Sequence, residues 1–407
     1  MDEERSHPVL VVGAGPVGLT AALALRAQGL PVTVLEAGTE DRERPGSRAI
    51  FIHRESLDHL EQARPGLGWD IAANGLVWST KRTFWGDKQV YERTYPPPDP
   101  AALPHSTNLA QVRTERLLLD AGKAAGVEFV WDSDVVDVQC GADRVELTTS
   151  AGRRWSAGYV VAADGGHSAV RRLVGIAMQG TRSENTFVIV DVAEVEQCPR
   201  RPERVFFYRH PAVGGRNVLL VPFTGGWRAD LQCRPDDDPA EFSQPDGVRR
   251  WIAAVLPGPY SERITWISTY QFLQVVAERL VDTHRRVLLV GEAAHLFAPF
   301  GARGLNSGIA DAVAAAGAIR QAIDTPTGGR ASAAIIEFEE RRREAARYNR
   351  DAARQALGHM QAHDVRTRVR RGAAAVVARA GVRAGAWLDA APYGPRADRG
   401  RGHSGTY

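Results

Sequence analysis

A glycine-rich turn close to the N-terminus constrains the fold of this 407-residue chain more than any other feature of its sequence. In a strand–turn–helix setting, the first glycine permits a tight turn, the second lets the backbone approach a pyrophosphate, and the third lets helix and strand pack closely. The start of the helix favours phosphate charge. The turn follows PVLVV, precedes LTAALALRAQG, and consists of Gly13, Ala14, Gly15, Pro16, Val17 and Gly18. The pattern therefore predicts a βαβ unit that binds a dinucleotide.

An acidic residue stands where the adenosine end of a dinucleotide is expected. The second apolar run, PVTVLE, ends at Glu36, and an acidic residue about 20 positions after such a turn binds a ribose hydroxyl. We therefore expect Glu36 and the adjacent Ala37 at the cofactor. A glycine turn without a ligand is the alternative, which the flanking strand, the helix and the acidic residue together make much less favourable. This motif alone does not distinguish NAD from FAD.

A second stretch, GEAAHLFAPFGARGLNSG at 291–308, favours FAD. It follows RRVLLV, which reads as a buried strand, and it leads into a helix. FAD is long, and a carboxylate at the strand end can bind its ribityl or ribose hydroxyls. The positive end of the helix can face the flavin edge that gains negative charge on reduction. The cofactor contacts expected from this stretch are Glu292, Pro299, Gly304, Leu305 and Asn306.

A third motif, AADGGHSAVRRLVGI at 162–176, lies between these two. The three motifs in this order resemble the single-component FAD-dependent aromatic hydroxylases, the para-hydroxybenzoate-hydroxylase-like flavoprotein monooxygenases. The resemblance covers essentially the whole chain, and it implies that Asp164 serves both the flavin site and the nicotinamide donor. Where that family usually has Asp, this chain has Glu292, which keeps the charge on a longer side chain. The resemblance also implies FAD contacts at Arg48, Gln111, Val135 and Gly165.

The reaction that this resemblance implies is the hydroxylation of a phenolic or polycyclic aromatic substrate. NADH or NADPH would reduce FAD, O2 would add to give a flavin C4a-hydroperoxide, and its distal hydroxyl would pass to the ring. The motifs serve the cofactor rather than the substrate, so other chemistry on the same fold stays open. The alternatives are epoxidation, Baeyer–Villiger insertion, oxidative decarboxylation and N-hydroxylation, or a non-catalytic flavin- or ligand-binding protein.

The order of the predicted elements indicates an α/β chain interrupted by a β-rich insertion. We expect a Rossmann-like FAD-binding domain, an inserted, mostly antiparallel β-sheet that binds the substrate, and C-terminal helices. The segment LVWSTKRTFWGDKQVYERTY at 76–95 alternates like a β-hairpin that turns at its Gly-Asp pair. The expected divisions are 1–177 and 283–330 for the FAD-binding domain, 178–282 for the β-rich domain, and 331–407 for C-terminal helices and a tail.

The substrate is expected between the flavin and the β-rich insertion. A base there would raise the nucleophilicity of a phenol, and His or Tyr commonly fills that role. A core or surface role is an alternative for each candidate, and none is assigned as the catalytic acid or base. His295 is expected to support the loop rather than to act on substrate. The candidates for the substrate pocket, chosen by placement, are Tyr208, His210, Tyr270 and Arg303.

Composition and charge exclude several other classes of protein. The net charge of +3 gives no sign of a nucleic-acid partner, and no apolar run is long enough to span a bilayer. The three cysteines lack metal-ligand spacing, so no metal is expected. The acidic start is unlike a secretory signal, and a reducing cytoplasm is the expected compartment. We expect a monomer or homodimer, because the arginine-rich segment 339–350 fits either an exposed helix or a dimer surface.

Overall fold

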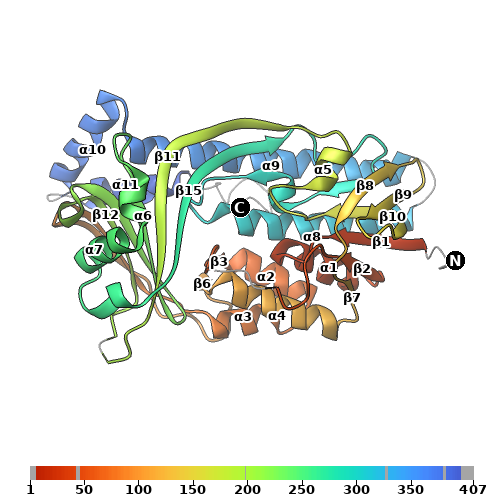
Figure 1. Cartoon of the computed structure of the whole chain (residues 1–407), viewed down its shortest axis with the longest axis horizontal. Helices are drawn as coiled ribbons and strands as arrows, with labels where there is room; N and C mark the ends of the chain where they lie inside the picture. Colours follow the sequence, from red (N-terminus) through yellow and green to blue (C-terminus); the bar gives the residue numbers. More distant parts are fainter. Residues whose placement is uncertain (1–5, 43–45, 198, 326–328, 379–381, 396–407) are drawn as a thin grey trace.

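The computed structural model describes residues 6–42, 46–197, 199–325, 329–378 and 382–395. Two sheets lie at opposite ends of the molecule, and the long antiparallel strands β11 (Met178–Ala193) and β15 (Ile264–Ala277) extend from one end to the other (Figure 1). Helix α9 (Gly329–Gln361) runs along the same direction (Figure 1). The arrangement confirms the expected α/β class with an inserted β-rich part and C-terminal helices.

The first sheet is built around the predicted βαβ unit. Within the described ranges its strands follow the order β7-β2-β1-β10-β9-β8, and β16 also pairs with β10. The pairs β7–β2, β2–β1, β1–β10 and β10–β16 are parallel. The central strands are buried along their length, as expected for parallel strands that helices cover on both faces. The strands are β1 (Ser6–Val12), β2 (Val32–Leu35), β7 (Glu128–Val130), β8 (Val135–Cys140), β9 (Val145–Thr149), β10 (Arg154–Ala162) and β16 (Val287–Leu289).

Helices α1 and α8 pack against each other beside this sheet, and their apolar faces share its hydrophobic core. Helix α1 begins at Pro16, where the missing N–H of proline removes a donor that would lack a partner in the first turn. The remaining helices surround the two sheets. The helices are α1 (Pro16–Ala27), α2 (Arg54–Ala63), α3 (Leu67–Asn74), α4 (Gln111–Ala124), α5 (Ala169–Leu173), α6 (Pro239–Ser243), α7 (Pro245–Val255), α8 (Arg303–Asp324), α10 (Val365–Val377) and α11 (Val382–Ala390), with short 3-10 turns η1 (Pro211–Val213), η2 (Pro259–Glu262), η3 (Gly291–Ala293) and η4 (Ala391–Tyr393).

The second sheet is mostly antiparallel, with the strand order β17-β15-β11-β14-β13-β12-β4-β5 in the described part of the chain. The predicted hairpin forms as β4 and β5, and it turns at Gly86 with φ of 64°. This hairpin pairs with β12, so residues 80–94 contribute to the second sheet although they precede the insertion. Pairing over such a sequence distance leaves no local signal. The further strands are β4 (Thr80–Trp85), β5 (Lys88–Thr94), β12 (Glu203–His210), β13 (Arg216–Phe223), β14 (Gly226–Gln232) and β17 (His295–Leu296), and β3 (Phe51–His53) pairs separately with β6 (Ser106–Asn108).

The two faces of the second sheet have different neighbours. Val218, Leu231 and Val188 are aligned across three strands, and they pack with α7 in one hydrophobic core. Alternate residues point to the opposite face. There, the sheet borders a large cavity and a second core that includes residues of the C-terminal helices. The helices α6 and α7 within the insertion were not predicted from the sequence.

The arginine-rich segment 339–350 lies in α9 and has both exposed and buried side chains. Arg341 forms an exposed ion pair with Glu337 at 2.6 Å, as expected for a solvated helix. Arg342 and Asn349 are instead buried against α8. The predicted tail beyond residue 395 lies outside the described residues.

Candidate active site

One cavity of about 1450 Å³ reaches from the glycine turn to the inner face of the second sheet. Val12, Leu35 and Val290 mark the carboxyl ends of β1, β2 and β16 along one side of it. Ligands of open α/β sheets bind at this edge, because the loops that follow the strands converge there. All but three of the predicted cofactor residues line the cavity; Ala14, Gly18 and Asn306 do not.

The glycine turn brings backbone N–H groups to the cavity wall. Gly13 has φ of 101°, and a Cβ at this position would lie 2.5 Å from the carbonyl oxygen of Ala163. A Cβ at Gly18 would lie 1.9 Å from the carbonyl oxygen of Gly13, so this glycine permits the close packing of helix and turn. Gly15 caps α1 and lines the cavity. The first turn of α1 therefore presents its positive end to this space.

Glu36 lies at the edge of the same turn. Its carboxylate accepts hydrogen bonds from the N–H of Ala14 at 2.5 Å and from the N–H of Gly38 at 3.1 Å. Ala14 does not line the cavity, and its backbone N–H instead holds the Glu36 carboxylate in place. Glu36 and Ala37 both line the cavity, next to Val135 at the start of β8.

Asp164 follows β10, and one of its two carboxylate oxygens is hydrogen-bonded within the protein. Its Oδ2 accepts a hydrogen bond from the N–H of Val170 at 3.0 Å, whereas its Oδ1 is buried without a hydrogen-bond partner in the described part of the chain. Burial raises the pKa of this carboxyl. Arg171 joins the motif to η3 by donating to the carbonyl oxygen of Ala293 at 3.2 Å. Asp164 and Gly165 line the cavity, so an acceptor is available there for a ligand hydroxyl.

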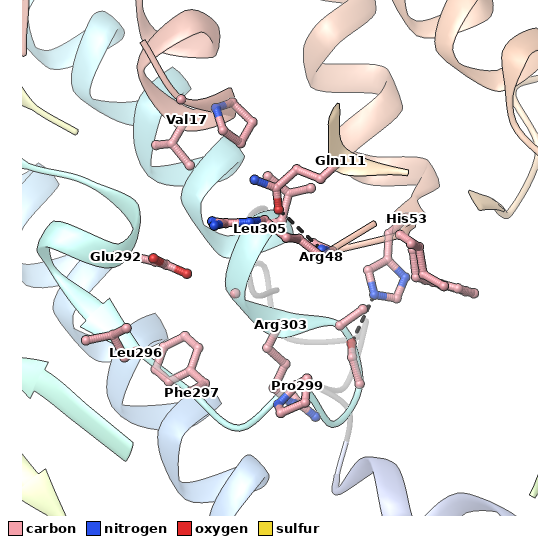
Figure 2. Close-up of a pocket in the computed structure, with 18 of the residues that line it drawn as sticks. Val17, Arg48, His53, Gln111, Glu292, Leu296, Phe297, Pro299, Arg303 and Leu305 are labelled. Atoms are coloured by element: carbon pink, nitrogen blue, oxygen red, sulfur yellow. Dashed lines mark hydrogen bonds between the residues drawn. The ribbon is translucent and has the colours of Figure 1, made fainter. Parts of the chain in front are cut away.

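Glu292 and the start of α8 lie on another side of the cavity. Figure 2 shows the Glu292 side chain pointing into the open space, with Arg48 and Gln111 across from it. A Cβ added at Gly304 would meet no atom within 4 Å, so the first turn of α8 leaves room for a planar group. Pro299 and Leu305 complete this part of the wall.

Asn306 does not present its side chain to the cavity, contrary to expectation. Its Oδ1 accepts from the N–H of His53 at 2.9 Å and from the hydroxyl of Ser56 at 2.7 Å. Its Nδ2 donates to the carbonyl oxygens of Phe51 and Ala302 at 3.0 and 2.7 Å. These four bonds use the whole amide, so Asn306 fixes the start of α8 against β3 and α2.

Arg48 and Gln111 are held at the cavity by the loop before β3. Arg48 has φ of 48°, a left-handed conformation that is unusual for a residue with a side chain. Arg228 on β14 donates to the carbonyl oxygen of Arg48 and to Asp191 Oδ1, the latter at 3.2 Å. Gln111 Oε1 accepts from the N–H of Ala49 at 3.2 Å. The second sheet therefore helps to position a loop at the cavity wall, a link that the sequence does not indicate.

The four substrate-pocket candidates fall into two groups. Tyr270 and Arg303 line the cavity, although Arg303 is also bound to Asn349 Oδ1 at 2.8 Å. Tyr208 and His210 are absent from its wall, so the prediction that they contact substrate is not supported. The Tyr208 hydroxyl lies 2.8 Å from His359 Nε2 and donates to the carbonyl oxygen of Leu388 at 2.7 Å, under the C-terminal helices.

A buried network behind the loop that leads into α8 was missed in the sequence. His295 Nε2 lies 2.6 Å from Asp311 Oδ2, and Arg342 Nε donates to Asp311 Oδ1 at 2.6 Å. Burial alone would raise the pKa of Asp311, but Arg342 and His295 hold it at about 2. His295 thus lies in the supporting position that was expected. The only sequence signal for its partners was helical spacing, which also fits an exposed face.

Comparison with known proteins identifies the family of this chain and its cofactor. A family model described as an FAD binding domain matches residues 6–353. The chain belongs to this FAD-binding family. Its homologues include flavoprotein monooxygenases that act on aromatic compounds.

Two curated relatives and one solved structure illustrate the likeness. The 6-methylpretetramide 4-monooxygenase of Streptomyces rimosus is 31% identical over 329 residues, which are 77% of this chain and 55% of the relative. The 3-(3-hydroxy-phenyl)propionate/3-hydroxycinnamic acid hydroxylase of Mycolicibacterium gilvum is 29% identical over 333 residues, which are 77% of this chain and 53% of the relative. The chain thus spans about half the length of these relatives. The crystal structure of p-nitrophenol 4-monooxygenase from Pseudomonas putida has a TM-score of 0.77 and 25% identity, and the match covers 96% of this chain and 100% of that one.

The donor set of the cavity fits the FAD that the family binds. The N-terminus of α1 offers N–H groups suited to a diphosphate, and Glu36 offers acceptors near the adenosine end. The Oδ1 of Asp164 has no hydrogen-bond partner among the described residues, and it is suited to a hydroxyl of the cofactor. In the described ranges no group of three His, Cys, Asp or Glu residues could hold a metal ion, and no helix is long and apolar enough to cross a membrane.

Proposed function

We propose that this protein is an FAD-dependent monooxygenase that uses NADH or NADPH and O2 to hydroxylate a phenolic or polycyclic aromatic substrate. The observation that carries this proposal is the single cavity that joins the dinucleotide turn to an aromatic wall on the second sheet. A cofactor bound at the turn and a substrate bound at the sheet would share this space, as transfer of an oxygen atom between them requires.

The residues around the cavity have distinct roles in this proposal. Gly13, Gly15 and Val17 bind the diphosphate at the start of α1, and Glu36 binds the adenosine ribose. Asp164 and Glu292 bind hydroxyls farther along the cofactor. Bound FAD supplies the redox chemistry that activates dioxygen. The remaining contacts proposed for FAD are Pro16, Ala37, Arg48, Gln111, Val135, Gly165, Pro299, Gly304 and Leu305, all at the cavity wall.

The substrate side of the cavity is aromatic and contains several cations. Trp266, Tyr270 and Phe272 come from β15, and the rings of Tyr270 and Phe272 are stacked at 6.3 Å. Rings of this kind favour flat aromatic ligands. The cavity cations suit a substrate that carries or develops negative charge: Lys81, Arg93, Arg204, Arg228 and Arg303.

Product analysis with isotope-labelled O2 tests the proposed reaction. The protein loaded with FAD is incubated with NADH or NADPH and a panel of phenols and polycyclic phenols. We expect one labelled oxygen atom on an aromatic carbon of at least one substrate. A product that contains an epoxide, that has oxygen inserted into a carbon–carbon bond, or that has lost a carboxyl group would show that the protein catalyses one of the alternative reactions. Complete absence of NAD(P)H oxidation would instead indicate a flavin- or ligand-binding protein.

A further inference from the structure

Asp230 is an acidic residue in the substrate part of the cavity that the sequence did not single out. It lies on β14, where its neighbours Ala229 and Leu231 point toward the α7 core. Asp230 therefore points to the opposite face, together with Leu219 and Ile189, which stand directly across from it on β13 and β11. All three residues line the cavity.

The Asp230 carboxyl makes no hydrogen bond to any residue in the described ranges. Its Oδ1 is buried without a partner, and the residues directly opposite are apolar. The nearest cation along β14 is Arg228, but its guanidinium donates to Asp191, to the Ser47 hydroxyl and to the Arg48 carbonyl. Buried polar groups are normally paired in the protein or with a ligand, so this carboxyl is an acceptor suited to a bound molecule.

The surroundings of Asp230 also favour proton exchange near neutral pH. Burial raises the pKa of Asp230 to about 7; Arg228 lowers it and Asp191 raises it. An ordinary Asp has a pKa near 4 and a phenol near 10, so this change brings the two groups closer by about three pKa units. Arg228 of β14 and Asp191 of β11 act directly on the Asp230 carboxyl. The other charged or titratable groups that strands of this sheet, α8 and η4 present to the same cavity are Lys81 of β4, Arg93 of β5, Arg204 of β12, Tyr270 of β15, Arg303 of α8 and Tyr393 of η4.

We propose that Asp230 binds the hydroxyl of a phenolic substrate and is the base that removes its proton. This inference rests on the proposed function. The phenol O–H bond breaks, the proton forms a new O–H bond on the carboxylate, and the electron pair stays on the phenolate oxygen. The step needs no oxidant or reductant. The extra electron density on the ring favours its attack on an electrophilic oxygen.

The charges of the cavity favour a hydroxyl over a cationic group as the ligand of Asp230. Arg204, Arg228 and Arg303 line the same cavity, so a substrate ammonium would meet several positive charges. A phenolate would instead be stabilised by a guanidinium donor that the described residues do not use. Arg204 supports this, because its Nη2 is buried without a hydrogen-bond partner in the described part of the chain, while its Nη1 donates to Asp389 at 2.7 Å.

The test compares Asp230→Asn with Asp236→Asn, an exposed acid on the same segment. Each FAD-loaded variant is assayed from pH 5.5 to 9 with the phenol that the unmodified protein hydroxylates best. General-base catalysis contributes about 100-fold or more. We expect Asp230→Asn to lower kcat by about that factor and to remove an ionisation near pH 7 from the rate profile. FAD content and the rate of flavin reduction without substrate stay unchanged, and Asp236→Asn matches the unmodified protein throughout.

A binding measurement separates this inference from the proposed function. Affinities for 4-ethylphenol, whose pKa is about 10, and for its methyl ether are measured by the change in flavin absorbance. We expect the unmodified protein to prefer the phenol about tenfold or more, and Asp230→Asn to lose that preference. Equal binding of both compounds by the unmodified protein, or an unchanged rate profile in Asp230→Asn, would overturn the role of Asp230. An unmodified protein that prefers the phenol but hydroxylates none would overturn the proposed function and leave the binding role standing.

Discussion

At the scale of single residues, the neighbours that cover a side chain decide its function. Tyr208 and Asp230 point to the same face of the second sheet, yet Tyr208 is buried under the C-terminal helices and Asp230 faces the cavity. We expect Tyr208→Phe to destabilise the fold by about 1–3 kcal/mol, because buried partners lose their hydrogen bonds, and to leave kcat unchanged. Tyr270→Phe is the comparison variant for stability. The Tyr270 hydroxyl has no hydrogen bond to a described residue, so its removal is expected to leave the free energy of unfolding nearly unchanged. Urea unfolding and steady-state kinetics check both; a fall in kcat at full stability would give Tyr208 a direct role.

Gly15 is a residue at which an added side chain would enter the cavity directly. It caps α1 at the cavity wall, and a branched side chain there would occupy the space proposed for the diphosphate. We expect Gly15→Val to purify without bound flavin and to take up no added FAD. Gly317→Ala is the control, because a Cβ at that position meets no atom within 4 Å. A yellow, fully loaded Gly15→Val protein would contradict the proposed binding mode.

At the scale of elements, Asp311 joins α8 to η3 and α9. Its carboxylate contacts the N–H of Gly291, His295 and Arg342, all buried. Removing one partner of a buried ion pair costs about 3–5 kcal/mol, so we expect Asp311→Asn to lose that much stability at pH 7. The pKa of Asp311 is held at about 2, below its unfolded value near 4. The stabilisation is therefore present above pH 4 and is lost as the pH falls through about 2.

Urea unfolding at pH 7 and at decreasing pH measures this difference. Asp324→Asn is the matched control, because Asp324 lies on the same helix and its side chain is 57% exposed. An exposed pair contributes little, so the control is expected to stay within about 0.5 kcal/mol of the unmodified protein. If the destabilisation by Asp311→Asn were the same at pH 2 and pH 7, the ion pair would not be its cause.

At the scale of the whole molecule, the sequence predicts those features of fold and site that depend on residues close together in the chain. The glycine turn, Glu36 and the start of α8 are local patterns with a direct physical reading, and the structure places them around one cavity. Asp230 and the hairpin at 80–94 depend on pairing between distant strands, which no local pattern reveals. Tyr208 points to the same face as Asp230, but it is covered by His359 and Leu388, which lie more than 150 residues further along the chain. The side-chain partners of Asn306 in 51–56 come from far along the chain, so the sequence contains no sign of them.

The cavity also makes a prediction for the molecule as a whole, since cofactor and substrate would share one space. The visible spectrum of the FAD-loaded protein, followed without oxygen after addition of NADPH or NADH with and without phenols, tests this most directly. We expect flavin bands that bleach with at least one donor, and faster by about tenfold with a phenol that binds the cavity. A protein that takes up no FAD, or a yellow protein that neither donor bleaches, would contradict the account.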